Sequence, residues 1–570
     1  MLEKLRRGTY KPFVRKILVI LSCLAAIKLI FFGIERDETY AISLAYRLMQ
    51  GDKLLSEMWE AHQTSSLLAA MLIHVYIAVT GTTTALVIYL RVISVCINLV
   101  IAYAMYRVMR NYAREELCFL GATIYFNMAP KDYLIPDFSC NQVWSVTLLA
   151  LCLIQFERYY GSIKAYVYIC LSGVLMCYVV LSYPSCIIMF PFILYALFIS
   201  RRDKRPLFVF IGICIVGAGM FFSYLLGYMD VNHIKESLGY VLSSDGSHES
   251  GEIGAVTYFT ESLRQTLIMA MWYIDGIGAA LLWKVARVKK YNARESVNDI
   301  LWFGIFSFLP VAAAVQLIFL FLPTQMPWLA SNIYFAVVML VGLWMWAENK
   351  FPYIMWPAYV CGIMAFVCTV MLSNLSVYNS LPYMISGSAI GLVLFANVVC
   401  DRLQDVNKGF WSLATVAVAI IITRGFLLGQ SSVEKATIFD TAGIIRNGPA
   451  RGIMADYMTA YMYNANYEEY VSYIQPGDKV LIASDTTIDY LNIPDVEICV
   501  NSTISTPTYD ENLKEYWEKN PEKYPTVVVV DCWYGETRYP EGTWLGDWLA
   551  TEYCANEIVD GKYYRYYFKR

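Results

Sequence analysis

The chain has 570 residues, of which 58% are hydrophobic and only 16% are charged. Soluble domains are usually about 45–50% apolar and about 25% charged. The mean hydropathy of +0.46 also shows that the chain is more apolar than a usual soluble domain. These values argue against a soluble enzyme, a disordered scaffold and a coiled coil. The net charge of −3 is small, so the positions of the charges carry more information than their sum.

Apolar stretches long enough to cross a bilayer recur along most of the chain. A basic leader precedes the first stretch, 17–34, and no small-residue cleavage site follows it, which predicts a retained span. Further stretches of roughly 18 residues predict bilayer-spanning helices. They lie at about 86–106, 117–130, 140–156, 165–181, 185–200, 206–227, 266–283, 300–321, 328–346, 352–372, 382–400 and 410–428. We therefore expect an α-helical polytopic membrane protein with about 13 transmembrane helices.

The stretch Ser65–Val79 is apolar but short, and it contains His74. We interpret it as an interfacial helix on the outer membrane surface. With this assignment the cytoplasmic segments carry 23 Lys and Arg residues, against 6 in the external loops between spans. The positive-inside rule then predicts a multi-pass protein of the cell membrane, with a cytoplasmic N-terminus and an extracytoplasmic C-terminal domain.

The predicted outer side holds the polar segments of interest. They are the acidic loops 35–85 and 228–265 and a short loop at 131–139. The cytoplasmic loops are short and basic and contain no glycine-rich phosphate loop, which argues against nucleotide chemistry there. We expect the chemistry of this protein to take place outside.

The chain is expected to divide into a transmembrane domain, 1–429, and a soluble extracytoplasmic domain, 430–570. In the second domain, strand-like runs at 479–484 and 526–531 flank a helix-like segment at 512–520. This alternation predicts a small α/β fold. The domain carries 22 acidic and 12 basic residues, so no nucleic-acid partner is expected. Its aromatic residues are expected to pack in a core rather than to stack on sugars; they include Trp533, Tyr534, Trp544 and Trp548.

Cysteine and histidine usage points to no disulfide and no metal site. Most of the 15 Cys lie in apolar spans, and the four in polar segments have no diagnostic spacing. These four are Cys140, Cys499, Cys532 and Cys554. The four His show no metal-ligand spacing. A divalent cation bound by the acidic outer loops stays an open alternative.

Asp37 and Glu38 form an acidic pair just beyond the first span. A carboxylate that is partly desolvated at the mouth of a helix bundle can act as a general base. The alternative is an ordinary exposed acidic loop that also starts a helix.

Four more charged residues are candidates for the substrate site. Asp137 opens the fourth span, where a helix N-cap is the competing explanation. Lys28, Arg91 and Arg424 lie within spans and could bind a phosphate group. For Lys28 and Arg424 the alternative is snorkelling to the outer interface. Asp275, in the middle of the eighth span, is expected to have a buried partner.

The first outer loop resembles that of the polyprenyl-phosphate-sugar-dependent glycosyltransferases of the GT-C fold. The resemblance covers a DE-x-Y-A-x3-A-x5-G frame, followed by the interfacial helix and Arg91. The matching residues are Asp37, Glu38, Tyr40, Ala41, Ala45 and Gly51. This superfamily includes protein O-mannosyltransferases and lipid A aminoarabinose transferases. The overall layout of about thirteen spans, a long first loop and a C-terminal outer domain is similar as well.

The resemblance implies an inverting glycosyltransferase that takes a hexosyl or pentosyl group from a polyprenyl-phosphate donor. The acceptor would be a cell-surface glycan, lipid or protein. Asp37 would be the general base, supported by Glu38. The chain departs from the family at 61–68, AHQTSSLL, where many relatives carry Lys-Pro-Pro. His62 there could contact the acceptor or the carrier phosphate, although a plain polar loop residue also fits. Arg91, Asp137 and Arg424 complete the predicted binding residues.

Two other classes of function compete with this prediction. A flippase or transporter of a lipid-linked glycan would show paired halves and interrupted helices, and the sequence shows no such internal symmetry. A membrane-anchored glycan-binding protein would need no acidic first loop, and its residues 430–570 would bind alone.

Overall fold

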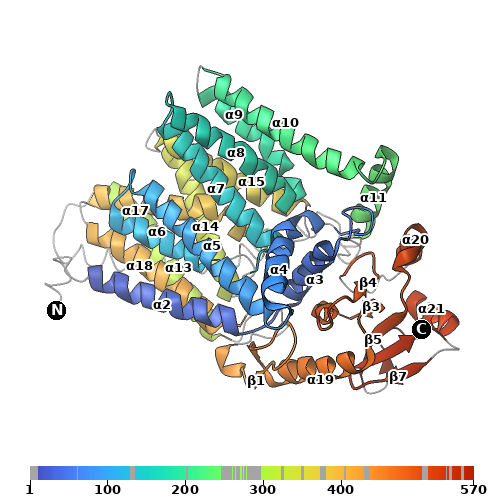
Figure 1. The fold of residues 1–570 in the computed structure, drawn as a ribbon. Coiled ribbons are helices and arrows are strands. Elements are labelled where there is room, and N and C mark those ends of the chain that lie inside the picture. Colours follow the sequence, from blue (N-terminus) through green and yellow to red (C-terminus); the bar gives the residue numbers. More distant parts are fainter. Residues whose placement is uncertain are drawn as a thin grey trace.

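The computed structural model consists of a large helix bundle with a smaller α/β domain at one end (Figure 1). This architecture confirms the predicted fold class. The structure describes residues 11–60, 62–128, 135–200, 203–244, 297–322, 327–347, 352–372, 380–403, 406–428, 437–484, 486–503, 511–533, 536–537, 539, 542–553 and 557–569, with scattered positions between 260 and 278.

Twelve of the thirteen predicted spans coincide with helices in the described part of the chain. These are α2 (Lys11–Phe31), α5 (Leu86–Met109), α6 (Glu115–Asn127), α7 (Phe138–Arg158), α8 (Ile163–Ser182), α9 (Met189–Ser200), α10 (Arg205–Leu226), α13 (Val297–Phe321), α14 (Pro327–Ala347), α15 (Trp356–Leu372), α17 (Ile385–Leu403) and α18 (Val406–Phe426). Short 3-10 turns lead into three of them: η3 (Pro184–Ile188), η5 (Tyr353–Met355) and η6 (Leu381–Met384). Most of the remaining predicted span, 266–283, and all of Asp275 lie outside the described residues.

Seven helical stretches of the described chain are long and apolar enough to cross a membrane. Six of them match predicted spans, and four other predicted spans are helices with shorter apolar runs. Two further predicted spans are helices that do not meet these criteria: α2 carries four basic residues, and α6 has only 13 residues. The seventh stretch, Gln63–Thr80, is the predicted interfacial helix, and its placement on the membrane surface stays a prediction.

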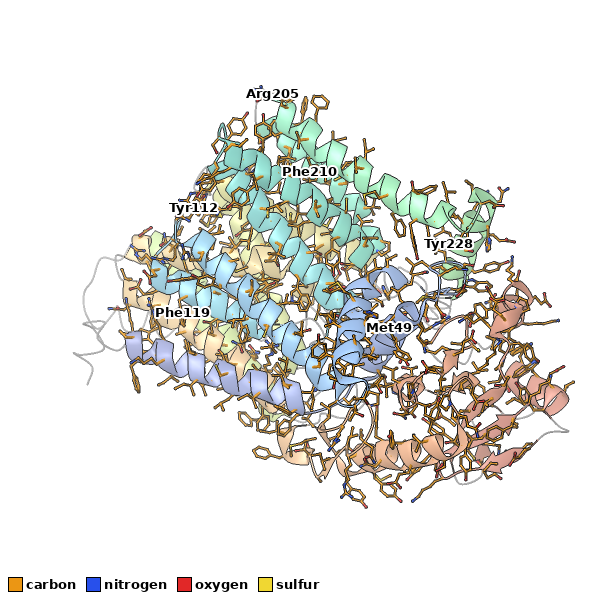
Figure 2. The ribbon with its side chains drawn as sticks, in the orientation of Figure 1. Met49, Tyr112, Phe119, Arg205, Phe210 and Tyr228 are labelled. Carbon is orange, nitrogen blue, oxygen red and sulfur yellow. The ribbon has the colours of Figure 1, made fainter. Side chains whose placement is uncertain are left out.

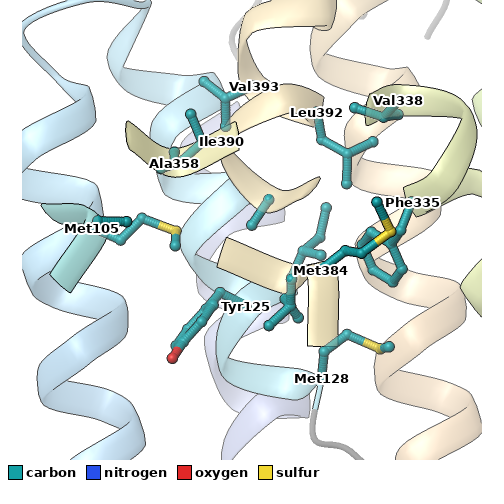
Figure 3. Close-up of a cluster of buried hydrophobic side chains, with 14 of the residues drawn as sticks. Met105, Tyr125, Met128, Phe335, Val338, Ala358, Met384, Ile390, Leu392 and Val393 are labelled. Carbon is teal, nitrogen blue, oxygen red and sulfur yellow. The ribbon is translucent and has the colours of Figure 1, made fainter. Parts of the chain in front are cut away.

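Helix α7 lies at the centre of the bundle and packs against α8 and α15. Leu149, Leu153 and Ile154 on this helix are fully buried. The core around α6 and α17 includes Tyr125, Ile390 and Val393 (Figure 3). Helices α6 and α17 approach closely, because a Cβ placed on Gly121 would lie 2.2 Å from Val393 Cγ2.

The C-terminal domain contains a six-stranded mixed sheet with the order β4-β3-β5-β8-β7, and β6 pairs with β5. Its strands are β3 (Lys479–Ala483), β4 (Glu497–Ile498), β5 (Val527–Trp533), β6 (Glu536–Thr537), β7 (Ile558–Asp560) and β8 (Tyr564–Phe568). Strand β3 runs parallel to β4 and β5, whereas β8 runs antiparallel to β5 and β7. Its helices are α19 (Tyr457–Tyr473), α20 (Glu511–Lys519) and α21 (Trp544–Glu552). Strands β3 and β5 confirm the two predicted strands. Helix α20, which lies between them in the chain, confirms the predicted helix at 512–520.

The aromatic residues of this domain behave largely as predicted. Trp517 stacks on Trp548 with ring centroids 4.8 Å apart, and Trp544 lies parallel to Trp548 at 6.0 Å. All three belong to one hydrophobic cluster with the sheet. The side chain of Trp533 and the whole of Tyr534 lie outside the described residues.

Two of the three predicted outer loops, 35–85 and 228–265, have described helices at the same end of the bundle as the C-terminal domain (Figure 1). The first loop contains α3 (Arg36–Gln50) and α4 (Leu67–Thr80), preceded by the 3-10 turn η1 (Gln63–Ser66), and the other loop contains α11 (Val231–Ser244). Figure 2 labels Met49 of α3 and Tyr228, whose hydroxyl donates to the Leu54 carbonyl at 2.9 Å. One hydrophobic cluster joins residues of α3, α4 and α11 to the sheet of the C-terminal domain. The first loop therefore packs as part of the C-terminal domain, which we also call the outer domain after its predicted location.

Buried ion pairs reinforce this contact. Arg47 Nε lies 2.8 Å from Asp52 Oδ2, and Lys523 Nζ lies 2.6 Å from Asp52 Oδ1. Arg47 and Glu60 are 3.7 Å apart, and Thr503 of the C-terminal domain donates to Glu60 through its hydroxyl at 3.0 Å. We call Arg47, Asp52, Glu60 and Lys523 the buried ion network. None of these four residues is more than 7% exposed.

Candidate active site

The predicted acidic pair lies in the first turn of α3. Glu35 takes an extended backbone conformation at the N-cap, and the helix begins at Arg36. Acidic residues in the first turn of a helix are stabilised by the helix dipole. Asp37 is half-buried and Glu38 is completely buried. An ordinary exposed loop is therefore excluded for Glu38.

Glu38 forms a two-point ion pair with Arg91 of α5. Arg91 donates from Nε to Glu38 Oε1 at 2.6 Å and from Nη2 to Glu38 Oε2 at 2.5 Å. It also donates to backbone carbonyls at the end of α2, including those of Leu29 and Gly33. All three nitrogens of this guanidinium thus hold α2, α3 and α5 together. The contacts of Arg91 are those of a residue that positions Glu38, and the substrate-binding role predicted for Arg91 stays a prediction.

Asp137 occupies the N-cap of α7, and its side chain accepts a hydrogen bond from the Cys140 backbone N–H at 2.7 Å. The competing explanation of a helix cap is thereby confirmed for one carboxylate oxygen. Asp137 is only 2% exposed. A binding role for this buried carboxylate stays a prediction.

His62 lies directly beside this helix start. Its ring stacks on that of Phe138, with centroids 3.9 Å apart and planes 9° from parallel. The ring of Tyr183 lies 5.6 Å from that of His62 and 6.4 Å from that of Phe138. The first loop therefore reaches the start of α7, which brings His62 and Asp137 close together.

The two cations near the end of the last span are both buried. Arg424 donates from Nη1 to the Phe126 carbonyl at 2.6 Å, and Lys28 donates from Nζ to the Leu427 carbonyl. The side chains are 2% and 6% exposed, respectively. Burial to this extent argues against snorkelling into solvent for either residue.

Cys140 marks the point at which these groups converge. Its backbone N–H donates to Asp137 Oδ1 at 2.7 Å, and its thiol is within electrostatic range of Asp137, Arg424 and Glu38. We call Glu38, Asp137, Cys140 and Arg424 the inner polar cluster. Residues separated by nearly 390 positions in the chain thus lie in the same part of the bundle, and Asp37 directly precedes Glu38 at the start of α3.

An apolar groove of about 410 Å³ lies between α8 and α10. Its lining residues are almost entirely apolar and include Val180, Ile187, Phe190 and Phe221. Thr64 is also part of the lining and donates from its hydroxyl to the Leu181 carbonyl at 2.6 Å. We call this feature the α8–α10 groove. Since Thr64 is two residues from His62, one end of the groove lies next to the start of α7.

The C-terminal domain contributes to the surroundings of the acidic pair. Tyr463 of α19 is near Glu38, Glu35 and Arg36, and burial raises the pKa of its hydroxyl. Ser43 of α3 donates to the Thr487 carbonyl at 2.8 Å, and Thr83 donates to the Leu491 carbonyl at 2.7 Å. The short helical turn η8 (Thr487–Leu491) therefore holds the outer domain against the first loop.

Asp489 in this turn is completely buried, which raises its pKa from the ordinary value of 3.8 to about 7. Tyr564 and Asn492 donate to its carboxylate at 2.7 and 2.8 Å, and these bonds offset part of the shift. The folded state therefore keeps this proton to a higher pH than the unfolded state. Stability is expected to fall as the pH rises from about 4 to about 7, by roughly 3–4 kcal/mol at most.

Thermal unfolding of the full chain, followed by tryptophan fluorescence between pH 4.5 and 8, measures this dependence. Asp489→Asn is expected to flatten the fall in Tm across that range, because the amide does not ionise. Glu518→Gln on exposed α20 should leave the dependence unchanged. An unaltered slope in Asp489→Asn would show that other groups control it.

Several site residues escaped prediction from sequence. Ser139 and Tyr383 share a hydrogen bond of 2.7 Å, and Asn141 donates to the Ser65 carbonyl at 2.9 Å, which ties α7 to the first loop. The signal was the polar run SCNQ at 139–142 at the start of an apolar span. Tyr463 carried no such signal, because α19 meets α3 only through the tertiary fold.

No group of three or more metal-ligating side chains occurs among the described residues. Cys499 and Cys532 are buried free thiols, and Cys554 lies outside the described part of the chain. A requirement for a divalent cation stays untested.

The fold and the long apolar helices define a polytopic α-helical membrane protein. The sequence matches no protein-family model and no curated protein. Among solved structures, the chain is similar to an oligosaccharyltransferase from Archaeoglobus fulgidus, crystallised with zinc and sulfate. The TM-score is 0.43 and the identity is 12%, and the match covers 90% of this chain and 68% of that one. It is also similar to ArnT from Cupriavidus metallidurans in the apo state, with a TM-score of 0.39, 10% identity and 97% of both chains covered. Because both TM-scores are below 0.5, the function is proposed from this chain's own residues.

Proposed function

We propose that this protein is an integral-membrane glycosyltransferase that uses a polyprenyl-phosphate-linked sugar donor. The sugar passes to a glycan, lipid or protein acceptor at the outer face of the cell membrane. The observation that carries the proposal is the α8–α10 groove, one end of which lies next to the start of α7, where Asp137 and Cys140 of the inner polar cluster are found. A lipid-linked sugar needs both an apolar channel for its tail and polar groups at its phosphate and sugar.

The chain of contacts from groove to cluster is short. Thr64 and Pro184 line the groove, and they are next to His62 and Tyr183, which pack around Phe138. Asp137 immediately precedes Phe138. A lipid tail in the groove would therefore place its phosphate near the start of α7, within the outer end of the bundle.

In the proposed reaction, Asp37 accepts the proton of the acceptor hydroxyl as its oxygen attacks the anomeric carbon. The bond between that carbon and the carrier phosphate oxygen breaks, and polyprenyl phosphate leaves with inversion at the anomeric centre. Glu38 and Arg91 position Asp37, since they fix the first turn of α3. Arg424 is the cation proposed for the phosphate, and His62 and Asp137 are proposed to contact the donor head group.

Sugar transfer by purified protein in nanodiscs tests the proposal directly. Synthetic polyprenyl-phosphate sugars with different sugars and isotopically labelled acceptors would be supplied in a panel, and products would be detected by mass spectrometry. Covalent transfer of the sugar is the expected result. Movement of labelled donor across proteoliposomes without covalent product would instead establish a transporter.

Narrowing the groove should weaken donor binding without touching the acidic pair. Ala218 lines the groove on α10, and we expect Ala218→Trp to raise the KM for the lipid donor by about tenfold, because the indole occupies space needed by the tail. Gly219→Trp is the matched control, since a Cβ at Gly219 meets nothing within 4 Å. Equal donor KM values in the two variants would remove the groove from the proposal.

A further inference from the structure

A polar cavity, separate from the α8–α10 groove, lies between the ends of α5 and α7 and has a volume of about 430 Å³. Three of its lining residues are arginines. The lining consists of Arg107, Arg110, Asn111, Gln155, Arg158 and Tyr159. We call this cavity the arginine pocket. Arg107, Arg110 and Asn111 lie next to Tyr112 (Figure 2) in one segment predicted to be cytoplasmic, and Arg158 and Tyr159 lie in the next such segment. The acidic pair, by contrast, begins α3 near the opposite end of α5.

The positive charge of the pocket is poorly balanced by the protein. Among the described residues, only Arg110 of the three pairs with a carboxylate, Glu115, at 3.5 Å. Arg107 donates to the Tyr103 hydroxyl at 3.1 Å, which supplies no negative charge. Arg158 lies 5.3 Å from the centre of the Tyr159 ring, and Lys164 lies at the same distance from that ring. Several cations thus share one cavity, and their mutual repulsion favours a bound anion.

Helix α5, which lines the pocket, and helix α8, which begins shortly after it in the chain, present apolar side chains to the surroundings. On α5, Leu99 and Val100 are 56% and 66% exposed. On α8, which begins just after the pocket, Ile163 and Val167 are 79% and 55% exposed. In a membrane-spanning bundle such side chains contact lipid tails. The pocket is therefore expected to lie at the level of lipid head groups, directly beside lipid-facing walls.

We propose that the arginine pocket binds the phosphate group of an anionic phospholipid. Guanidinium groups recognise phosphate oxygens through paired, charge-assisted hydrogen bonds. The acyl chains of such a lipid would lie against the exposed apolar residues of α5 and α8. A soluble phosphate would use the same arginines but would gain nothing from these walls. This site is independent of the proposed transfer reaction.

Lipid-dependent thermal stability of the full chain tests this inference. The protein in neutral detergent would be titrated with phosphatidylglycerol, with phosphatidylcholine and with inorganic phosphate, while Tm is recorded. Phosphatidylglycerol alone is expected to raise Tm, and the increase should diminish with added salt. The double variant Arg107→Gln/Arg158→Gln is expected to bind this lipid at least about tenfold more weakly, since each arginine contributes about 1 kcal/mol.

Arg205→Gln provides a matched control, because Arg205 is an exposed arginine at the start of α10 that pairs with Asp203. It should respond to phosphatidylglycerol like the unaltered chain. The inference is overturned if phosphatidylcholine is equally effective or if the double variant keeps the full response. It is also overturned if inorganic phosphate gives the same protection, since the ligand would then be a soluble anion. Tm in neutral detergent alone reports whether each variant is folded.

Discussion

Asp37→Asn is expected to reduce sugar transfer by about 10²–10⁴-fold, because the amide cannot accept the proton of the attacking hydroxyl. Asp37 is half-buried in the first turn of α3, and Asn keeps the size and shape of its side chain, so we expect Tm to change much less than kcat. The loss should appear in kcat, with the KM for the lipid donor close to that of the unaltered chain. Initial rates with a synthetic donor, measured beside Tm, give both quantities.

Two further variants separate catalysis from positioning. Glu38→Gln breaks the buried pair with Arg91 and is expected to lower both Tm and kcat. Asp230→Asn changes an exposed carboxylate just before α11, at the same end of the molecule, and should retain activity. If Asp37→Asn and Asp230→Asn transfer sugar equally well, Asp37 is not the base.

The second large effect is expected at the buried ion network. Asp52→Ala leaves the guanidinium of Arg47 and the ammonium of Lys523 buried without their common partner. Removing one member of a buried ion pair typically costs about 3–5 kcal/mol. For the C-terminal domain and the first loop packed on it, this loss of unfolding free energy corresponds to a fall in Tm of roughly 10 °C. Differential scanning fluorimetry of the full chain measures it.

Lys53→Ala is the matched control for this prediction. Lys53 is the next residue and pairs with Glu57 at 3.5 Å, but its side chain is 52% exposed. Exposed pairs contribute only about 0–1 kcal/mol, so Tm should hardly change. Similar shifts in the two variants would mean that the network does not hold the first loop and the outer domain together.

Local patterns in the sequence predicted the helices and strands well. Twelve spans, the strands β3 and β5 and the helix α20 all follow from apolar periodicity and turn residues, which act over a few residues. The fate of the outer acidic residues could not be predicted in this way. Asp52 and Glu60 looked like solvated loop residues, but their partners lie far away in the chain, as Lys523 does at a separation of 471 residues.

The same reason explains what was missed at the candidate site. The sequence showed that Arg91 is a charged residue within an apolar span. It did not show that Arg91 pairs with Glu38, because that contact depends on how α2, α3 and α5 cross. The predicted boundary near residue 430 follows a real change in composition. It does not reveal that 35–85 shares a hydrophobic core with the C-terminal domain, because that contact depends on tertiary packing.

The shared core has a consequence for the order in which the protein matures. The first loop emerges early in synthesis, whereas Thr487, which it contacts through Ser43, follows 444 residues later. Contacts between such distant segments form slowly, because a long loop of chain must close first. Until strands β3 to β8 have reached the same side of the membrane, α3 has no partner for its apolar face or for Arg47. During that interval the newly made chain would be most exposed to proteases and most dependent on chaperones.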